Sequence, residues 1–367
     1  MSTDTRAEAD LRWMRRAIEH ARRGLGRTTP NPVVGACIVS TDGVVVGQGA
    51  HERAGEAHAE VHALDEAGDA ARGATLYCTL EPCVHLGRTG PCTDRIIAAG
   101  IRRVVAAMED PFPQVSGRGF AVLRAHGIDV EVGLCADEAA RLNQPFLTTV
   151  REGRPFVIVK AATSLDGQIA AGAGQRTAIT SAAALRHAHY QRAMVDAIAI
   201  GSETLLVDDP LLTPRGVFRE RPLIRVVFDR RFRVPPTARV FTTHHDGPVI
   251  ILTTPDAMQA DPARLDALAV AGATVVGVSG DIRDALRELT RRDVQSLLVE
   301  GGAALHAALW DAGVVDYVQL YVAPVWLGPA GVPLFGGRGV PAAALLDSRV
   351  ELLGPDVLIE GYVHRPH

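Results

Sequence analysis

The sequence has no surplus of basic charge and few aromatic residues. Its 38 basic residues are outnumbered by 42 acidic ones, which gives a formal net charge of −4, and aromatic residues make up 5% of the chain. A protein that binds nucleic acid needs a basic stripe, and one that binds single strands also needs aromatic side chains for stacking. The composition therefore counts against a module that acts on or binds nucleic acid, and we expect no nucleic-acid partner.

The chain also lacks long apolar runs, and it has few cysteines. No run is long enough to span a membrane, and Met1–Asp10 lacks the apolar core of a signal peptide. The chain has five cysteines, and two of them are assigned to a metal site below. The other three, Cys37, Cys78 and Cys135, are an odd number, which argues against a disulfide framework. We expect a cytoplasmic protein without a membrane partner, and 367 residues predict two domains.

Lysine is almost absent, because Lys160 is the single lysine among the 38 basic residues. A sequence that uses arginine nearly everywhere has kept a lysine at this position. A compact ammonium group is not replaced by a planar guanidinium. We therefore interpret Lys160 as a functional residue, although retention by chance is the alternative.

Three residues have the spacing of a metal site. His58 is followed by Cys83 and, nine positions later, by Cys92. An imidazole and two thiolates are ligands that Zn²⁺ prefers, and three protein ligands leave a fourth position for water, whereas structural zinc sites usually have four protein ligands. The nearby Cys78 alternates with Leu76 and Leu80 in a strand-like run, so we expect it to be a buried small residue rather than a fourth ligand. A hydrolytic site with one zinc ion is therefore favoured over a structural one.

Glu60, two residues after His58, is the expected proton carrier of that site. The H-x-E…P-C signature of zinc deaminases uses a carboxylate that is not a ligand as general acid and base. Two thiolates and a neutral imidazole bring the zinc site close to zero net charge, so ionisation of the water needs help from a base. The expected reaction is attack on an amidine carbon of a pyrimidine-like ring, after which Glu60 passes a proton to the departing amine.

The first part of the chain alternates strand and helix patterns, which predicts a three-layer α/β/α domain. Asn31 lies before the first strand and His51 follows the second, so both are candidates for the pocket. We expect helices at Leu11–Leu25, Glu56–Ala67, Thr93–Ala99 and Phe120–His126, and strands at Val33–Val39, Val44–Gly49, Ala74–Leu80, Arg102–Met108 and Asp129–Val132.

A boundary is predicted within Leu142–Arg154, where a helix ends and proline and glycine follow. It separates a domain over residues 1–147 from one over residues 148–367. In the second domain, Phe156–Lys160 and Ser296–Val299 are expected strands, and Asp166-Gly167 is expected to be a turn.

In the second domain, small residues at the start of a helix after Glu300, namely Gly301 and Gly302, would let backbone N–H groups approach a phosphate. A guanidinium group is able to clamp a phosphate with two hydrogen bonds. From the residues alone, however, a solvated surface arginine is the favoured interpretation of both Arg192 and Arg215.

The first half of the sequence resembles a known family. The motifs are Asn31-Pro32-x-Val34-Gly35, His58-Ala59-Glu60 and Thr79–Cys92, which includes Gly87-Arg88-Thr89. They are similar to the deaminase half of the bifunctional riboflavin-biosynthesis deaminase–reductases. The resemblance implies a pyrimidine ribotide substrate, 2,5-diamino-6-ribosylamino-4(3H)-pyrimidinone 5′-phosphate, that is deaminated at its 2-position.

The resemblance continues through the second half, over Lys160–Gly167, Asp196–Thr204, Asp208–Arg215 and Glu300–Gly302. It implies a dihydrofolate-reductase-like α/β domain that uses NADPH to reduce ribosyl to ribityl, and a homodimer through this domain. The implied substrate-binding residues are Asn31, His51, Lys160, Arg176, Arg192, Leu212, Arg215 and Glu300. The implied cofactor-binding residues are Ala162, Ala178, Thr204, Asp208, Gly301 and Gly302, with Arg230 for the cofactor 2′-phosphate.

Two residues depart from the family pattern. Where relatives commonly have Ser-x-Trp, this chain has Arg176 and Ala178. Arginine is still able to contact a phosphate, whereas alanine loses most of an aromatic packing surface. The sequence therefore predicts weaker cofactor binding or slower reduction, and its main alternative function is a deaminase with an inactive or altered second domain.

Overall fold

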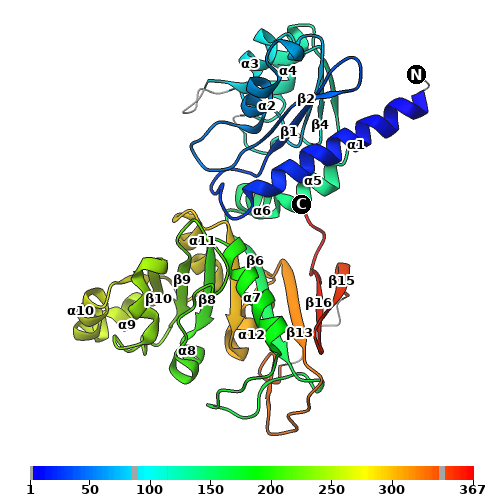
Figure 1. Cartoon of the computed structure of the whole chain (residues 1–367). Coiled ribbons are helices and arrows are strands. Elements are labelled where there is room, and N and C mark those ends of the chain that lie inside the picture. Colours follow the sequence, from blue (N-terminus) through cyan, green and yellow to red (C-terminus); the bar gives the residue numbers. More distant parts are fainter. Residues whose placement is uncertain (1–2, 85–89, 114, 339–343) are drawn as a thin grey trace. The chain divides into compact units, whose positions relative to one another are not determined.

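The structure is a computed structural model that describes residues 3–84, 90–113, 115–338 and 344–367 (Figure 1). The chain divides into two units, the first from Met1 to Glu152 with His367, and the second from Gly153 to Pro366. No helix among the described residues is both long and apolar enough to cross a membrane.

The first unit is a five-stranded sheet with helices on both faces (Figure 1). The strand order is β2-β1-β3-β4-β5, with β1 antiparallel to β2 and β3, and with β3, β4 and β5 parallel. The strands are β1 Gly35–Val39, β2 Val45–Ala50, β3 Thr75–Cys78, β4 Arg103–Ala106 and β5 Asp129–Val132. The helices are α1 Thr3–Ala21, α2 Ala59–Ala67, α3 Cys92–Ala98, α4 Arg118–Ala125, α5 Ala136–Leu142 and α6 Gln144–Glu152, with short 3₁₀ turns at Arg22–Gly24 and Gly68–Ala71.

Alternation along β3 divides the core of this unit between the two faces of the sheet. Leu76 and Cys78 pack with α2, α3 and α4. Tyr77, between them in sequence, packs with Met14 of α1 on the opposite face. The predicted three-layer arrangement is therefore confirmed, and so is the prediction that Cys78 is a buried small residue.

One element prediction in the first unit is wrong. The helix expected at Glu56–Ala67 begins only at Ala59, because the Ala57 carbonyl binds the His51 ring instead of a helical N–H group. His58 is thus the N-cap residue and not part of the first turn. The stretch Leu142–Arg154, where the boundary is predicted, contains the helix α6, and Pro145 lies in the first turn of this helix, where a missing N–H group does no harm. The division between the two units falls within this stretch, after Glu152.

The second unit is a nine-stranded sheet in the order β11-β10-β9-β8-β12-β6-β13-β16-β15. From β11 to β13 all neighbours are parallel, and the last three strands form an antiparallel edge. The strands are β6 Phe156–Thr163, β8 Ala197–Gly201, β9 Ile224–Phe228, β10 Val249–Thr253, β11 Ala273–Gly277, β12 Ser296–Gly301, β13 Tyr317–Val322, β15 Leu346–Leu353 and β16 Asp356–Tyr362, while β7 Gln168–Ala170 and β14 Val332–Pro333 form a separate pair.

Helices cover both faces of this sheet. One apolar cluster joins alternate residues of β6, β8, β9, β10 and β12 to α11 and α12, and a second joins the opposite face to α8, α10 and a 3₁₀ segment. The helices are α7 Ala182–Met194, α8 Ser202–Asp208, α9 Pro255–Ala260, α10 Pro262–Val270, α11 Ile282–Thr290 and α12 Ala303–Asp311, with the 3₁₀ segment at Arg239–Asp246. The expected turn at Asp166-Gly167 lies between β6 and β7, and the Asp166 carboxylate accepts the N–H groups of Leu327 and Gly328.

A buried carboxylate ties the start of the second unit to its end. Asp316 accepts two hydrogen bonds from Arg154, at 2.6 and 2.8 Å, and one from the Val157 N–H group at 2.7 Å. His364 Nε2 lies 3.0 Å from the same carboxylate. The hydrogen bond to Asp316 raises the pKa of His364 above 6.5, so its protonated form is favoured in the folded state.

This ion pair predicts a pH-dependent stability. Protonated His364 stabilises the folded chain below the unfolded pKa of about 6.5, and this contribution is lost as the pH rises through the higher folded value. We expect the melting temperature of wild-type protein to exceed that of His364→Gln at about pH 6 and to match it at about pH 9. A difference that does not change with pH, measured by differential scanning fluorimetry, would contradict the assignment.

Candidate functional site

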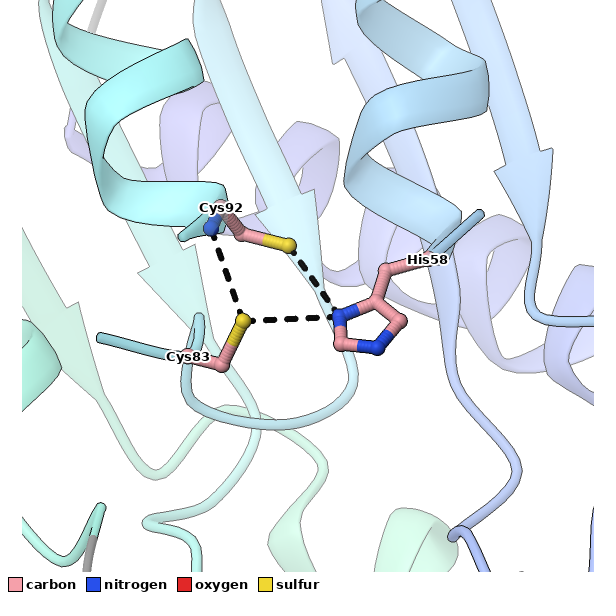
Figure 2. Close-up of side chains that lie close together, drawn as sticks. All are labelled: His58, Cys83 and Cys92. Carbon is pink, nitrogen blue, oxygen red and sulfur yellow. Dashed lines mark hydrogen bonds between the residues drawn. The ribbon is translucent and has the colours of Figure 1, made fainter. Parts of the chain in front are cut away.

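The three predicted metal ligands meet in the first unit (Figure 2). His58 is the N-cap residue of α2, Cys83 lies in the segment after β3, and Cys92 is the first residue of α3. His58 Nδ1 lies 3.2 Å from Cys92 Sγ and 3.4 Å from Cys83 Sγ, and the three ligand atoms are all within 4.8 Å of one another. Among the described residues, this is the group of His, Cys, Asp and Glu side chains able to hold a metal ion.

The chemistry of these donors fits zinc. A hydrogen bond with Cys92 lowers the pKa of Cys83, and the same contact raises the pKa of Cys92. Two adjacent thiolates repel one another, so both ionise together only when a cation lies between them. The Cys92 N–H group at the start of α3 also points to Cys83 Sγ, at 3.4 Å, which favours the thiolate form.

Glu60 lies in the first turn of α2, two residues after His58. Its side chain is buried, and Oε2 has no hydrogen-bond partner among the described residues. Burial raises the pKa of Glu60 to about 7, although the neighbouring His58 opposes this shift. A buried carboxylate with a free oxygen close to the ligand set is suited to accept a proton from water and to release it again.

Asn31 and His51 lie next to the ligand set. The Asn31 amide donates to His51 Nε2 at 3.1 Å, and His51 Nδ1 donates to the Ala57 carbonyl at 3.1 Å. Burial lowers the pKa of His51, which keeps the ring neutral and consistent with these two bonds. The His51 ring packs edge-on against His58, with 5.3 Å between the ring centroids. The predicted loop residues Gly87, Arg88 and Thr89 lie outside the described residues.

The second unit contains a cavity of about 1110 Å³ at the carboxyl ends of parallel strands, where open α/β sheets bind ligands. Its walls come from β6, β8, β9, β10 and β12 and from the segments that follow these strands. It brings together most of the residues predicted for the second site, namely Lys160, Ala162, Arg176, Ala178, Thr204, Asp208, Arg215, Arg230, Glu300, Gly301 and Gly302.

Two predicted residues do not line this cavity. Leu212 is buried, with a left-handed backbone at a φ of 55°. Arg192 forms a two-pronged ion pair with Glu300, at 2.7 Å for both contacts, and donates to the Thr213 carbonyl at 3.0 Å. Its guanidinium is therefore engaged inside the protein, whereas the exposed Arg215 faces the cavity and is the better candidate for a substrate phosphate.

The charges of two cations act on Glu300. Burial opposes its ionisation, but Arg192 and Lys160 lower the pKa of Glu300 to about 2. Burial lowers the pKa of Lys160, and the charge of Glu300 opposes that shift. The Lys160 ammonium lies 5.3 Å from the centre of the Tyr321 ring. The single lysine of the chain is thus a partly desolvated cation beside a firmly ionised carboxylate.

The start of α12 fits a phosphate group. A Cβ atom added at Gly302 would lie 2.8 Å from Thr204 Oγ1, so a larger residue at this position would have to displace the Thr204 hydroxyl. Gly302 is the N-cap residue of α12 and makes no side-chain cap, which leaves the first N–H groups of the helix available to an anion. The start of α12 and Arg230, which follows β9 by two residues, fit the phosphates of a dinucleotide cofactor.

Three polar residues of the cavity wall were not predicted from the sequence, namely Asp229, Thr253 and His306. Each is almost completely buried, and Asp229 Oδ1 and Thr253 Oγ1 have no hydrogen-bond partner among the described residues. Burial lowers the pKa of His306 to about 4. Asp229 and Thr253 lie at the carboxyl ends of β9 and β10, so strand ends were the available signal. His306, inside α12, had no such signal.

Comparison with known proteins identifies the family. A family model described as the RibD C-terminal domain matches residues 155–359, and one described as the cytidine and deoxycytidylate deaminase zinc-binding region matches residues 7–108. The riboflavin biosynthesis protein RibD of Aquifex aeolicus is 39% identical over 355 residues, which cover 96% of this chain and 98% of that protein. The chain belongs to the RibD family.

Other RibD proteins agree. RibD of Escherichia coli K12 is 42% identical over 333 residues, covering 87% of this chain and 89% of that protein. The solved structure of Acinetobacter baumannii RibD, form 1, has a TM-score of 0.87 at 36% identity and covers 98% of this chain and 99% of its own. A Thermotoga maritima diaminohydroxyphosphoribosylaminopyrimidine deaminase/5-amino-6-(5-phosphoribosylamino)uracil reductase gives 0.84 at 35% identity, over 99% of this chain and all of its own.

These findings confirm the expected fold class and family. The chain is an α/β protein of the bifunctional RibD family of riboflavin biosynthesis, with a zinc-binding deaminase domain and a reductase domain. No finding supports the alternative of an inactive second domain.

The Arg192–Glu300 pair predicts the effect of a conservative change. Arg192→Lys keeps the charge but cannot form two parallel hydrogen bonds with Glu300. We expect the free energy of unfolding to fall by about 1.5–3 kcal/mol in a urea titration, the range for hydrogen bonds to charged groups. Arg186→Lys, an exposed change on the same helix, is the matched control and should have no effect. Equal stability of both variants would show that the fork contributes nothing.

Proposed function

We propose that the first unit deaminates 2,5-diamino-6-ribosylamino-4(3H)-pyrimidinone 5′-phosphate and that the second unit then reduces the ribosyl group of the product to ribityl with NADPH. The proposed deamination rests on one observation, that the side chains of His58, Cys83 and Cys92 come together beside the buried Glu60. The second half is supported by the cavity at the strand ends, which is lined by the Gly301-Gly302 turn and by Arg176, Arg215 and Arg230. Family membership covers both halves.

In the first site, His58, Cys83 and Cys92 would hold one zinc ion per chain. Zinc held in this way supplies the Lewis acidity that makes water ionise near neutral pH. Glu60 takes the proton that water gives up and returns it to the departing amine, so that water is consumed and ammonia is released. Asn31 and the neutral His51 lie beside the ligands and would orient the pyrimidine ring.

In the second site, NADPH supplies a hydride. The Gly301-Gly302 turn and Thr204 would cradle its pyrophosphate, with Ala162, Ala178 and Asp208 along the nicotinamide side and Arg230 at the 2′-phosphate. Arg176 and Arg215 would bind the substrate phosphate. Lys160 and Glu300 would orient the sugar or exchange its proton, because they are the adjacent charged pair in the cavity wall.

We also propose a cytoplasmic homodimer that associates through the second unit. All five cysteines are unpaired, in keeping with a reducing compartment. The edge strand β15 exposes Leu346, Val350 and Leu352. An exposed apolar edge strand is a surface that a second copy would cover.

Product analysis tests this proposal as a whole. Zinc-loaded protein is mixed with the diamino substrate, with and without NADPH, and the products are separated by chromatography. We expect the deaminated ribosyl compound without NADPH and the ribityl compound with it. Formation of the deaminated compound alone in both cases would show that the second unit lacks reductase activity.

Glu60→Gln is expected to separate metal binding from catalysis. Because Glu60 is not a ligand, zinc should remain bound at one equivalent per chain. Loss of the proton carrier should slow deamination by about 10²- to 10⁴-fold, the usual contribution of general acid–base catalysis. Zinc is counted by atomic emission, and ammonia release gives the rate. Loss of zinc together with activity would contradict the assigned role.

Ala178→Trp tests the departure from the family pattern. An aromatic ring at this cavity position should restore packing surface for the cofactor, and aromatic packing contributes about 0.5–1.5 kcal/mol beyond buried area. The dissociation constant for NADPH should therefore fall by about two- to tenfold, measured by fluorescence titration, while the deamination rate stays the same. Unchanged or weaker NADPH binding would show that Ala178 does not limit cofactor affinity.

A further inference from the structure

Glu81 is a buried carboxylate in the first unit that has no part in the chemistry described above. It follows β3 and is separated from the metal ligand Cys83 only by Pro82. Its side chain is 3% exposed. A carboxylate is rarely buried without strong partners, because removal of a charge from water costs free energy. The partners of Glu81 therefore indicate what this residue does.

Four backbone N–H groups bind the Glu81 carboxylate, two on each oxygen. Oε1 accepts from Gly119 at 2.7 Å and from Phe120 at 3.3 Å. Oε2 accepts from Gly117 at 2.9 Å and from Asp110 at 3.2 Å. These donors come from the segment after β4 and from the first turn of α4, where unpaired N–H groups and the helix dipole favour an anion.

Gly119 brings this part of α4 into direct contact with the metal-binding segment. A Cβ atom added at Gly119 would lie 2.2 Å from the Pro82 carbonyl oxygen and 3.0 Å from Glu81 Oε1. The backbone of Pro82 is therefore pressed against α4 at a distance that no other residue permits. Since proline also fixes its own φ angle, a displacement of Glu81 would be passed on to Cys83.

The other side of Cys83 is held by α3. Thr93 Oγ1 donates to the Cys83 carbonyl at 3.3 Å, and the Cys92 N–H group donates to Cys83 Sγ at 3.4 Å. Cys83 is thus held directly by the start of α3, and Glu81 and Pro82 connect it to the start of α4. Glu81 itself is not in the ligand group, and both of its oxygens are occupied.

We propose that Glu81 is a positioning residue for zinc. It acts through Cys83, by anchoring the Glu81-Pro82-Cys83 segment to the start of α4, so that the thiolate is held at the place where His58 and Cys92 meet it. This inference rests on the proposed zinc site. Supporting groups of this kind typically change metal affinity or activity by about 10- to 100-fold when they are mutated.

Glu81→Gln tests the proposal in the zinc-loaded, full-length protein. The amide keeps the shape of the side chain but turns an NH₂ group toward two of the four N–H donors. We expect zinc to pass to a colorimetric chelator about tenfold faster than from wild type, or faster still. Gly119→Ala leaves the carboxylate intact and disturbs the same contact, so it should also release zinc faster.

Asp10→Asn is the matched control, since it makes the same chemical change at another buried carboxylate of this unit. Asp10 accepts hydrogen bonds from Arg103, at 2.9 and 2.7 Å, and from Tyr77 at 2.5 Å. Tyr77 packs on the face of the sheet opposite α2, α3 and α4, so this carboxylate lies away from the helices that carry the metal ligands. This variant should lower the melting temperature but release zinc at the wild-type rate.

The outcomes distinguish the inference from the proposed function. The positioning role is overturned if Glu81→Gln releases zinc at the wild-type rate. It is also overturned if Glu81→Gln releases zinc no faster than Asp10→Asn when both variants lose the same melting temperature. Either result leaves the zinc site itself standing. Wild-type protein that holds no zinc after purification under reducing conditions overturns the proposed function and this inference with it. Faster release from both Glu81→Gln and Gly119→Ala, but not from Asp10→Asn, supports the role of Glu81.

Discussion

Two sulfur atoms and an imidazole nitrogen are packed within 4.8 Å of one another in the first unit, beside a buried carboxylate. Such a cluster is stable only if its negative charge is balanced, because two thiolates and Glu60 repel one another in a low-dielectric environment. The fold brings the ligands together through two helix starts and one strand end. His58 caps α2, Cys92 begins α3, and Cys83 follows β3. The start of α4 joins the same arrangement through Glu81.

In the second unit, too, a buried negative charge has to be balanced, and cationic side chains balance it. Its cavity wall contains Glu300 and Lys160, and the charges of Arg192 and Lys160 keep Glu300 ionised although it is buried. Arg192 fixes the position of Glu300, which leaves Lys160 as the cation of the pair that faces the cavity. A buried ammonium group beside Glu300 is in keeping with the interpretation of Lys160 as a functional residue.

Much of the first site could be predicted from sequence, because His58, Glu60, Cys83 and Cys92 carry their chemistry in their residue types and spacing. The start of α2 could not, since it depends on the bond between the His51 ring and the Ala57 carbonyl. The partner of Arg192 could not either, because Glu300 is 108 residues away in sequence. Glu81 shows the same limit, since its four donors lie 29 to 39 residues further along the chain.

X-ray absorption at the zinc edge tests most directly whether His58, Cys83 and Cys92 hold the metal ion. One imidazole, two thiolates and one water as the fourth ligand predict two sulfur scatterers at about 2.3 Å and two nitrogen or oxygen scatterers at about 2.0–2.2 Å. The spectrum of protein purified under reducing conditions should show this mixed shell. A shell of four sulfur scatterers, or of nitrogen and oxygen alone, would contradict this set of ligands.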